Sequence, residues 1–113
     1  MDEIWKAVPS LDGIIASNLG RVARVGGTAR SGDGALQIMV DGQYHLVSHL
    51  VLEAFKGPDE SDAALQNSGR VYHLDGDVKN TNPDNLMWKN DMIRDLFQQV
   101  SALSLRRSIG DGG

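Results

Sequence analysis

The segment from Val71 to Trp88 constrains the fold of this chain more than any other part of its sequence. It reads Val-Tyr-His-Leu-Asp-Gly-Asp-Val-Lys-Asn-Thr-Asn-Pro-Asp-Asn-Leu-Met-Trp and sets His73 twelve residues before Asn85. Its Asp, Asn and Gly residues favour a tight loop, because their short side chains bond to nearby backbone groups. Leu86 and Trp88 alternate as the inward residues of a strand that follows this loop.

Composition limits the classes of protein to which the chain can belong. A chain of 113 residues is expected to form one domain with one modest core. No apolar run reaches the roughly 18 residues of a membrane-spanning helix, and the acidic start lacks the features of a signal peptide. We therefore expect a cytoplasmic protein without a membrane partner. Because cysteine is absent, a metal site would use oxygen and nitrogen ligands and favour a hard ion such as Mg²⁺.

The first half of the chain carries two predicted β-hairpins. In the first hairpin, β-rich runs flank Ser17-Asn-Leu-Gly20, where Asn and Gly tolerate the positive φ angles of a tight reversal. The second hairpin is expected to pair strands at 35–40 and 44–47 around a turn at Asp41-Gly42.

The second half of the chain changes to helical spacing. Ser48 is expected to cap a helix over residues 48–55, which Lys56-Gly-Pro ends. The acidic stretch 59–69 is expected to form an exposed loop. A C-terminal helix is predicted by an apolar stripe made of Ile93, Leu96, Phe97, Val100 and Leu103.

Two parts of the chain resemble the phage type of HNH homing endonuclease. Glu3-Ile-Trp-Lys-Ala-Val-Pro followed by Ser17-Asn-Leu-Gly-Arg-Val is similar to the modular DNA-binding motif that precedes the nuclease core in that family. A second part of the chain is similar to the nuclease core of that family: residues 48–55 followed by His73-Leu-Asp-Gly-Asp and Asn85-Leu-Met-Trp. The two parts stand in the family's order, which is more specific than one short motif.

The resemblance implies an α+β fold with N-terminal β-hairpins, a short linking helix, a ββα-metal core and a C-terminal helix. It divides a single domain, 1–113, into four parts. These are an N-terminal hairpin module at 1–47, a helix with an acidic loop at 48–70, the HNH-like core at 71–105 and a flexible tail at 106–113.

The resemblance assigns catalytic roles to His73 and Asn85. In the family, a strand presents the histidine as a general base for water, and imidazole suits this role because it titrates near physiological pH. The asparagine oxygen accepts a hydrogen bond from the second imidazole nitrogen and so orients the ring. The alternative is that His73 and Asn85 form a structural hydrogen bond that the turn between the strands requires.

The two positions at which the family holds its metal ion differ in this chain. Tyr72 stands immediately before His73, where the family usually has Asp, His or Asn, and its neutral phenol is a poor ligand. Arg94 stands nine residues after Asn85, where the family has His or Asn, and guanidinium offers no acceptor atom. Hydrolysis with Mg²⁺ is therefore expected to be impaired. Nearby residues that could rebuild a ligand set, outside the family's positions, are Asp75, Asp77, Asn90, Asp91 and Asp95.

A set of polar residues is expected to contact DNA phosphates: Lys6, Asn18, Arg21, Arg24, Arg30 and Arg94. Those in the N-terminal hairpins could form one positive surface, with the backbone amides of Asn18 and Gly20 exposed in the turn. The alternative is an ordinary solvated face. Trp5 and Trp88 are expected in the core rather than stacked on bases.

The resemblance implies an HNH endonuclease-like protein of phage origin that acts in the bacterial cytoplasm on double-stranded DNA, with hydrolysis impaired. A second prediction follows from the net charge of −4 and the acidic residues at 59–62, which would repel phosphate. An inactive HNH-derived chain could instead bind and inhibit a protein partner, for example a host defence component.

Overall fold

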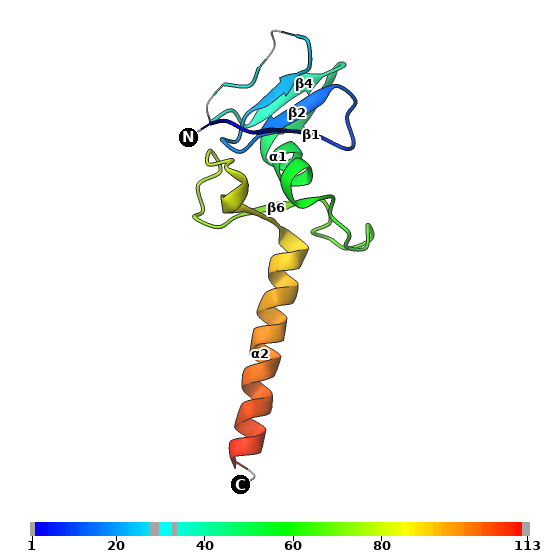
Figure 1. Ribbon diagram of the computed structural model, residues 1–113. Helices are drawn as coiled ribbons and strands as arrows, with labels where there is room; N and C mark the ends of the chain where they lie inside the picture. The colour runs from blue at the N-terminus through cyan, green and yellow to red at the C-terminus, as the bar shows by residue number, and fades with distance from the viewer. Residues whose placement is uncertain (1, 28–29, 33, 112–113) are drawn as a thin grey trace.

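The computed structural model describes residues 2–27, 30–32 and 34–111 of the chain. In chain order its elements are β1 (Trp5–Ala7), β2 (Ile14–Ser17), β3 (Val22–Arg24), β4 (Gln37–Val40), β5 (Gln43–Leu46), α1 (Val47–Lys56), β6 (Val71–His73), the short 3-10 helix η1 (Pro83–Asn85), β7 (Leu86–Trp88) and α2 (Lys89–Asp111). Figure 1 shows the N-terminal strands at one end, then α1, then the β6–β7 hairpin, with α2 extending away from them. The predicted α+β architecture is confirmed.

The N-terminal sheet forms because short β-rich runs alternate with tight turns. Its strand order is β1-β2-β3, and both pairs are antiparallel. The predicted reversal after Ser17 is confirmed, and the buried Ser17 Oγ accepts hydrogen bonds from Leu19 N (3.2 Å) and Arg21 N (3.1 Å). These bonds hold the turn in place, so β2 and β3 pair in one register.

The second hairpin leads directly into α1. β4 and β5 pair antiparallel around Asp41-Gly42, whose φ angles of 49° and 84° suit a tight turn. The amide of Val47 then donates to Leu36 O (3.0 Å), which positions the chain to begin the helix at Val47. The prediction that Ser48 caps α1 is therefore wrong: Leu46 is the N-cap residue, and Ser48 lies within the first turn.

One hydrophobic cluster joins the N-terminal strands, α1 and the β6–β7 hairpin. The apolar face of α1 lies within it, and Val51 and Leu52 are fully buried. The cluster contains Val8, Ile14, Ala16, Val22, Val40, Val47, Leu50, Val51, Leu52, Leu86 and Trp88. Trp88 is a core residue, as predicted, whereas Trp5 is only partly buried. The elements that carry the predicted site are thus held against the N-terminal strands by shared apolar packing.

A close contact joins the first hairpin to the loop between β6 and β7. Thr81 is 4% exposed, and its hydroxyl donates to Gly20 O (2.7 Å). Gly20 has a φ of 82°, and a Cβ at this position would lie 2.7 Å from the carbonyl carbon and oxygen of Thr81. Glycine is therefore required here by its backbone conformation and by the closeness of Thr81.

Gly20→Ala is expected to lower the free energy of unfolding by roughly 3 kcal/mol or more, because backbone strain and an overpacked contact each cost about 1–3 kcal/mol. Gly42→Ala is a matched control, since Gly42 has a similar φ of 84° and no atom lies within 4 Å of the added Cβ. We expect the control to cost about 1 kcal/mol. Denaturant unfolding measures both values, and equal losses would show that the contact with Thr81 adds nothing.

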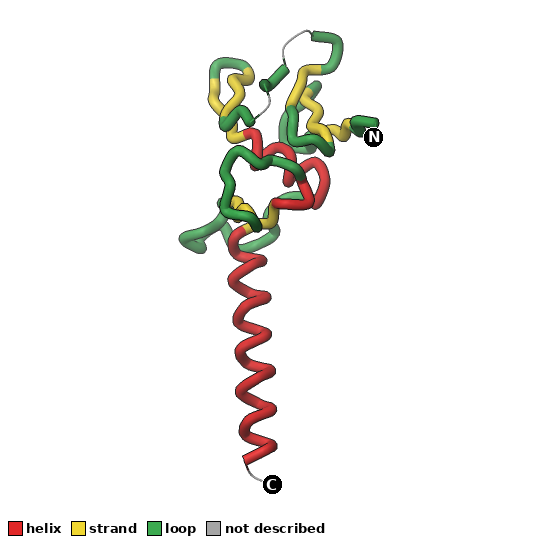
Figure 2. Tube along the Cα trace, turned by 90° about the vertical axis from the view of Figure 1, so that its left-hand side faces the viewer, coloured by secondary structure: helices red, strands yellow, loops and turns green. Residues whose placement is uncertain are grey.

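Helix α2 extends away from the other elements over most of its length (Figure 1, Figure 2). The predicted apolar stripe lies on this helix, yet Leu96, Phe97 and Val100 are 56%, 68% and 54% exposed. The helix continues to Asp111, beyond the predicted boundary at 105, because no residue before Gly110 breaks it. In the described part of the chain, no helix is long and apolar enough to cross a membrane.

Candidate functional site

The β6–β7 hairpin presents His73 at the end of a strand. β6 pairs antiparallel with β7, and His73 lies opposite Leu86. Because strand side chains alternate, His73 lies on the same face as buried Leu86, whereas Tyr72 and Met87 lie on the other face. His73 therefore faces α1 and the N-terminal strands, and Tyr72 does not.

Asn85 organises the loop between the strands rather than the imidazole. Its Oδ1 accepts from Asp75 N (3.0 Å), and its Nδ2 donates to Asp75 Oδ1 (2.9 Å) and Asn80 O (3.0 Å). Hydrogen bonds from Asn80 Nδ2, Asp77 N and Asn85 Nδ2 lower the pKa of Asp75. The predicted polar loop is confirmed. The expected bond between Asn85 and His73 is not formed in the described structure, because both amide atoms of Asn85 bond within the loop.

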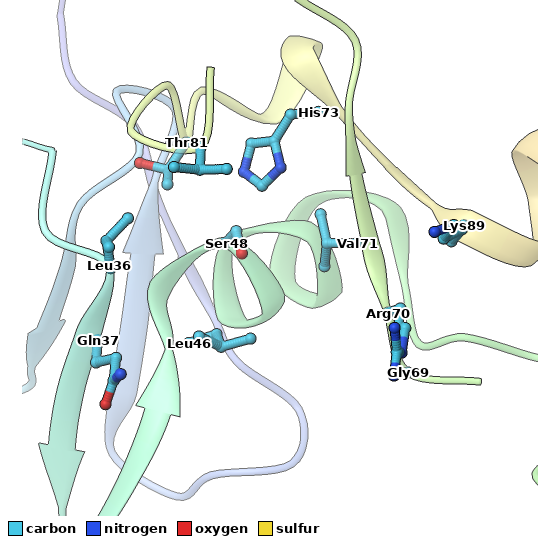
Figure 3. Close-up of a pocket in the computed structure, with 11 residues that line it drawn as sticks. Leu36, Gln37, Leu46, Ser48, Gly69, Arg70, Val71, His73, Thr81 and Lys89 are labelled. Atoms are coloured by element: carbon cyan, nitrogen blue, oxygen red, sulfur yellow. The ribbon is translucent and has the colours of Figure 1, made fainter. Parts of the chain in front are cut away.

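His73 lines a cavity of about 540 Å³ between the β6–β7 hairpin, α1 and the β4–β5 hairpin. In Figure 3, Leu36 and Leu46 lie on one side of this cavity, and Arg70 and Lys89 lie on the opposite side. The imidazole of His73 lies between these two groups. Segments far apart in the sequence therefore form one hollow, which we call the His73 cavity.

The Nε2 atom of His73 is buried and has no hydrogen-bond partner among the described residues. An unpaired buried polar atom costs roughly 1–3 kcal/mol, so it often marks the place of a water or a ligand. Ser48, in the first turn of α1, also lines the cavity. That turn has no side-chain cap and no acidic residue, so nothing within it offsets the partial positive charge of the helix N-terminus. These features suit an anionic group.

Two cations at the cavity were missed by the sequence analysis. Arg70 and Lys89 line it, and Lys89 N donates to Arg70 O (2.8 Å). Within residues 2–27, 30–32 and 34–111, neither side chain forms an ion pair. Their register could have identified them. Arg70 immediately precedes β6 and Lys89 immediately follows β7, so antiparallel pairing of the two strands places them side by side.

The cations predicted to contact DNA interact with neighbouring side chains. Three of them form ion pairs, namely Arg21 with Glu3 (2.9 Å), Arg24 with Asp41 (3.2 Å) and Arg94 with Asp91 (3.2 Å). Two lie over aromatic rings, namely Lys6 over Phe55 at 4.9 Å and Arg30 over Trp5 at 5.8 Å. The acidic partners offset the charges of Arg21, Arg24 and Arg94, and DNA contact by the predicted residues stays a prediction.

The turn amides predicted to be exposed for DNA are already bonded. The amide of Asn18 donates to Ile4 O (3.0 Å), and the amide of Gly20 donates to Ser17 O (3.0 Å). The side chain of Asn18 also accepts from Ile4 N (2.7 Å). The prediction of free amides at this turn is therefore wrong, because the turn and β1 use them to close the sheet.

At the two positions where the resemblance implies metal ligands, this chain carries Tyr72 and Arg94. Arg94 lines a separate hollow with Lys56, Glu60 and Asp91, and its guanidinium offers no acceptor atom. The described residues contain no group of three or more His, Cys, Asp or Glu side chains that could hold a metal. Asp75 and Asp91, two of the suggested replacement ligands, bond to the β6–β7 loop and to Arg94.

Comparison with known proteins gives one informative similarity. A scan against protein-family models found no match, and a search of curated proteins found none either. A solved structure described as "DNA binding and cleavage by the HNH homing endonuclease I-HmuI" matches 94% of this chain with a TM-score of 0.56 and 20% sequence identity. The match covers 65% of that enzyme's chain. This chain is therefore a small α+β protein similar in fold to an HNH homing endonuclease.

Proposed function

We propose that this chain is an HNH endonuclease-like protein that binds double-stranded DNA and hydrolyses it weakly or not at all. One observation carries the proposal: His73, whose buried Nε2 has no hydrogen-bond partner among the described residues, lines a cavity together with Arg70 and Lys89. Phosphate oxygens carry negative charge and accept hydrogen bonds, so they match these donors. The fold similarity to a DNA-cleaving enzyme supports the same reading.

The chemistry of the cavity supports binding more than cleavage. A neutral imidazole beside a bound phosphodiester can accept a proton from water, which keeps His73 as the candidate general base. Asn85 would act indirectly, through the loop that it anchors. Bound Mg²⁺ would stabilise the leaving oxygen by several kcal/mol, but Tyr72 and Arg94 do not fit it. We therefore propose a phage-encoded, DNA-binding derivative of the fold that acts in the bacterial cytoplasm.

Titration of duplex DNA at low and high salt tests this proposal. Binding should weaken steeply as salt rises, because each phosphate contact releases counterions and contributes about 0.9 to the slope of log K against log salt. Fluorescence anisotropy with a labelled duplex measures that slope. An affinity that ignores salt, or no binding at low salt, would exclude the phosphate contacts.

A second candidate function is inhibition of a protein partner. The ion pairs of Arg21, Arg24 and Arg94 reduce the positive charge available for DNA. The loop between α1 and β6 also exposes Glu60 and Asp62. Such an acidic surface is complementary to a basic groove on another protein.

Capture from a bacterial lysate tests the second candidate. The tagged wild-type chain should retain a partner that Glu60→Gln/Asp62→Asn does not retain. If both chains retain the same proteins, the acidic loop does not recognise a partner.

A further inference from the structure

The His73 cavity is larger and more apolar than a phosphate group requires. Its volume of about 540 Å³ falls within the roughly 300–1,000 Å³ of sites that hold small organic ligands. Four aliphatic side chains line it, namely Leu36, Leu46, Val71 and Val78. A phosphate has no surface that these side chains could cover favourably, so they suit a ligand with an apolar part.

Two of the aliphatic residues and the two cationic residues occupy different sides of the cavity. Figure 3 shows Leu36 and Leu46 opposite Arg70 and Lys89, with His73 between them. Leu36, Leu46 and Val78 are 47%, 51% and 54% exposed, so their apolar surface is open to a ligand. The complementary ligand therefore has an anionic part and a flat or apolar part.

The imidazole of His73 and the side chain of Ser48 add polar groups between these two sides. The Thr81 hydroxyl donates to Gly20 O, so its single proton is already used. A nucleobase has apolar faces and a polar edge, and its own phosphate supplies the negative charge. A nucleotide thus matches both sides of the cavity and the groups between them.

We propose that the His73 cavity binds an unpaired nucleotide of DNA, with its phosphate at Arg70 and Lys89 and its base against Leu36 and Leu46. This inference rests on the proposed DNA binding and specifies the form of DNA that the cavity prefers. A base within a duplex cannot enter the cavity, because its faces are covered by its stacked neighbours. A single strand, or a mismatched base that leaves the stack at little cost, can enter.

Anisotropy titrations with three labelled DNAs test the inference: a single strand, a fully paired duplex of the same sequence and that duplex with one central mismatch. The single strand and the mismatched duplex should bind about tenfold more tightly than the paired duplex, because only their bases reach the cavity without the cost of leaving a paired stack. A fluorescent adenine analogue at the mismatch should change its emission on binding. Equal affinity for the three DNAs would overturn the inference.

Substitutions at the apolar side provide the matched comparison. Leu36→Ala/Leu46→Ala should remove the tenfold preference of the single strand and the mismatched duplex over the paired duplex. Val78→Ala should reduce the preference independently. Leu65→Ala is the control, because Leu65 is 51% exposed, like Leu46, and lines a different hollow. Thermal unfolding of each variant confirms that it is folded.

The possible results separate this inference from the proposed function. Absence of binding to all three DNAs would overturn both. Salt-dependent binding without preference for unpaired bases would overturn the inference alone. Loss of preference in Leu65→Ala to the same extent as in Leu36→Ala/Leu46→Ala would also overturn it, because the effect would not depend on the cavity.

Discussion

The double variant Tyr72→Asp/Arg94→Asn is expected to nick plasmid DNA in the presence of Mg²⁺ at least about a hundredfold faster than the wild-type chain. The two changes introduce the ligand types that the HNH resemblance implies at these positions. A catalytic ion stabilises the transition state by several kcal/mol, and each 1.36 kcal/mol corresponds to about a factor of ten in rate. Both sites tolerate substitution, since Tyr72 is 37% exposed and the Arg94 side chain is 63% exposed.

Three controls make the nicking experiment specific. Tyr72→Phe/Arg94→Gln changes the same positions without adding ligands and should stay at the wild-type rate. Adding His73→Ala to the Asp/Asn variant should abolish the gain, because the candidate general base is lost. Chelation of Mg²⁺ should do the same. If the Asp/Asn variant gains nothing, the hypothesis that positions 72 and 94 prevent Mg²⁺-dependent cleavage is wrong.

The second large effect is expected for Arg70→Gln/Lys89→Gln, which should weaken duplex DNA binding roughly tenfold for each cation at low salt. A hydrogen bond to a charged group contributes roughly 1.5–3 kcal/mol, which sets this scale. The slope of log K against log salt should fall in magnitude by about 2, since each lost phosphate contact removes about 0.9. Anisotropy titrations at several salt concentrations measure the affinity and the slope.

Arg24→Gln/Arg94→Gln is the matched comparison for the cavity cations. It removes the same formal charge, but from arginines that lie 3.2 Å from Asp41 and Asp91. We expect its slope to change by less than about 0.5, because the acidic partners already offset these cations. Equal slopes for the two double variants would mean that DNA responds to net charge and not to the cavity.

Local residue patterns predicted the elements of the fold well. The reversals after Ser17 and at Asp41-Gly42 form where Asn, Asp and Gly permit positive φ angles. The linking helix spans Val47–Lys56, within one residue of the predicted bounds at each end. Helix and turn formation depends on residues close in sequence, so such patterns carry the necessary information. The cap at Ser48 failed because a long-range bond from Val47 N to Leu36 O sets where α1 begins.

The environment of the candidate site was predicted less well than its position. The motif located His73 and the polar loop, but the partners of Asn85 proved to be Asp75 and Asn80. The apolar stripe of α2 predicted a helix correctly, yet Leu96 and Phe97 are exposed, because the helix extends beyond the strands against which it begins. Periodicity reports which residues share a face, and it does not report what covers that face.

The sequence by itself determined the α+β class and the two N-terminal hairpins. Only the tertiary structure decided that Arg70 and Lys89 line one cavity with Leu36, Leu46 and His73. The same packing sets Arg24 beside Asp41, far along the chain. The physical reason is that charge and hydrogen-bond complementarity depend on distances in space, and folding brings distant segments together to bury their shared apolar surface.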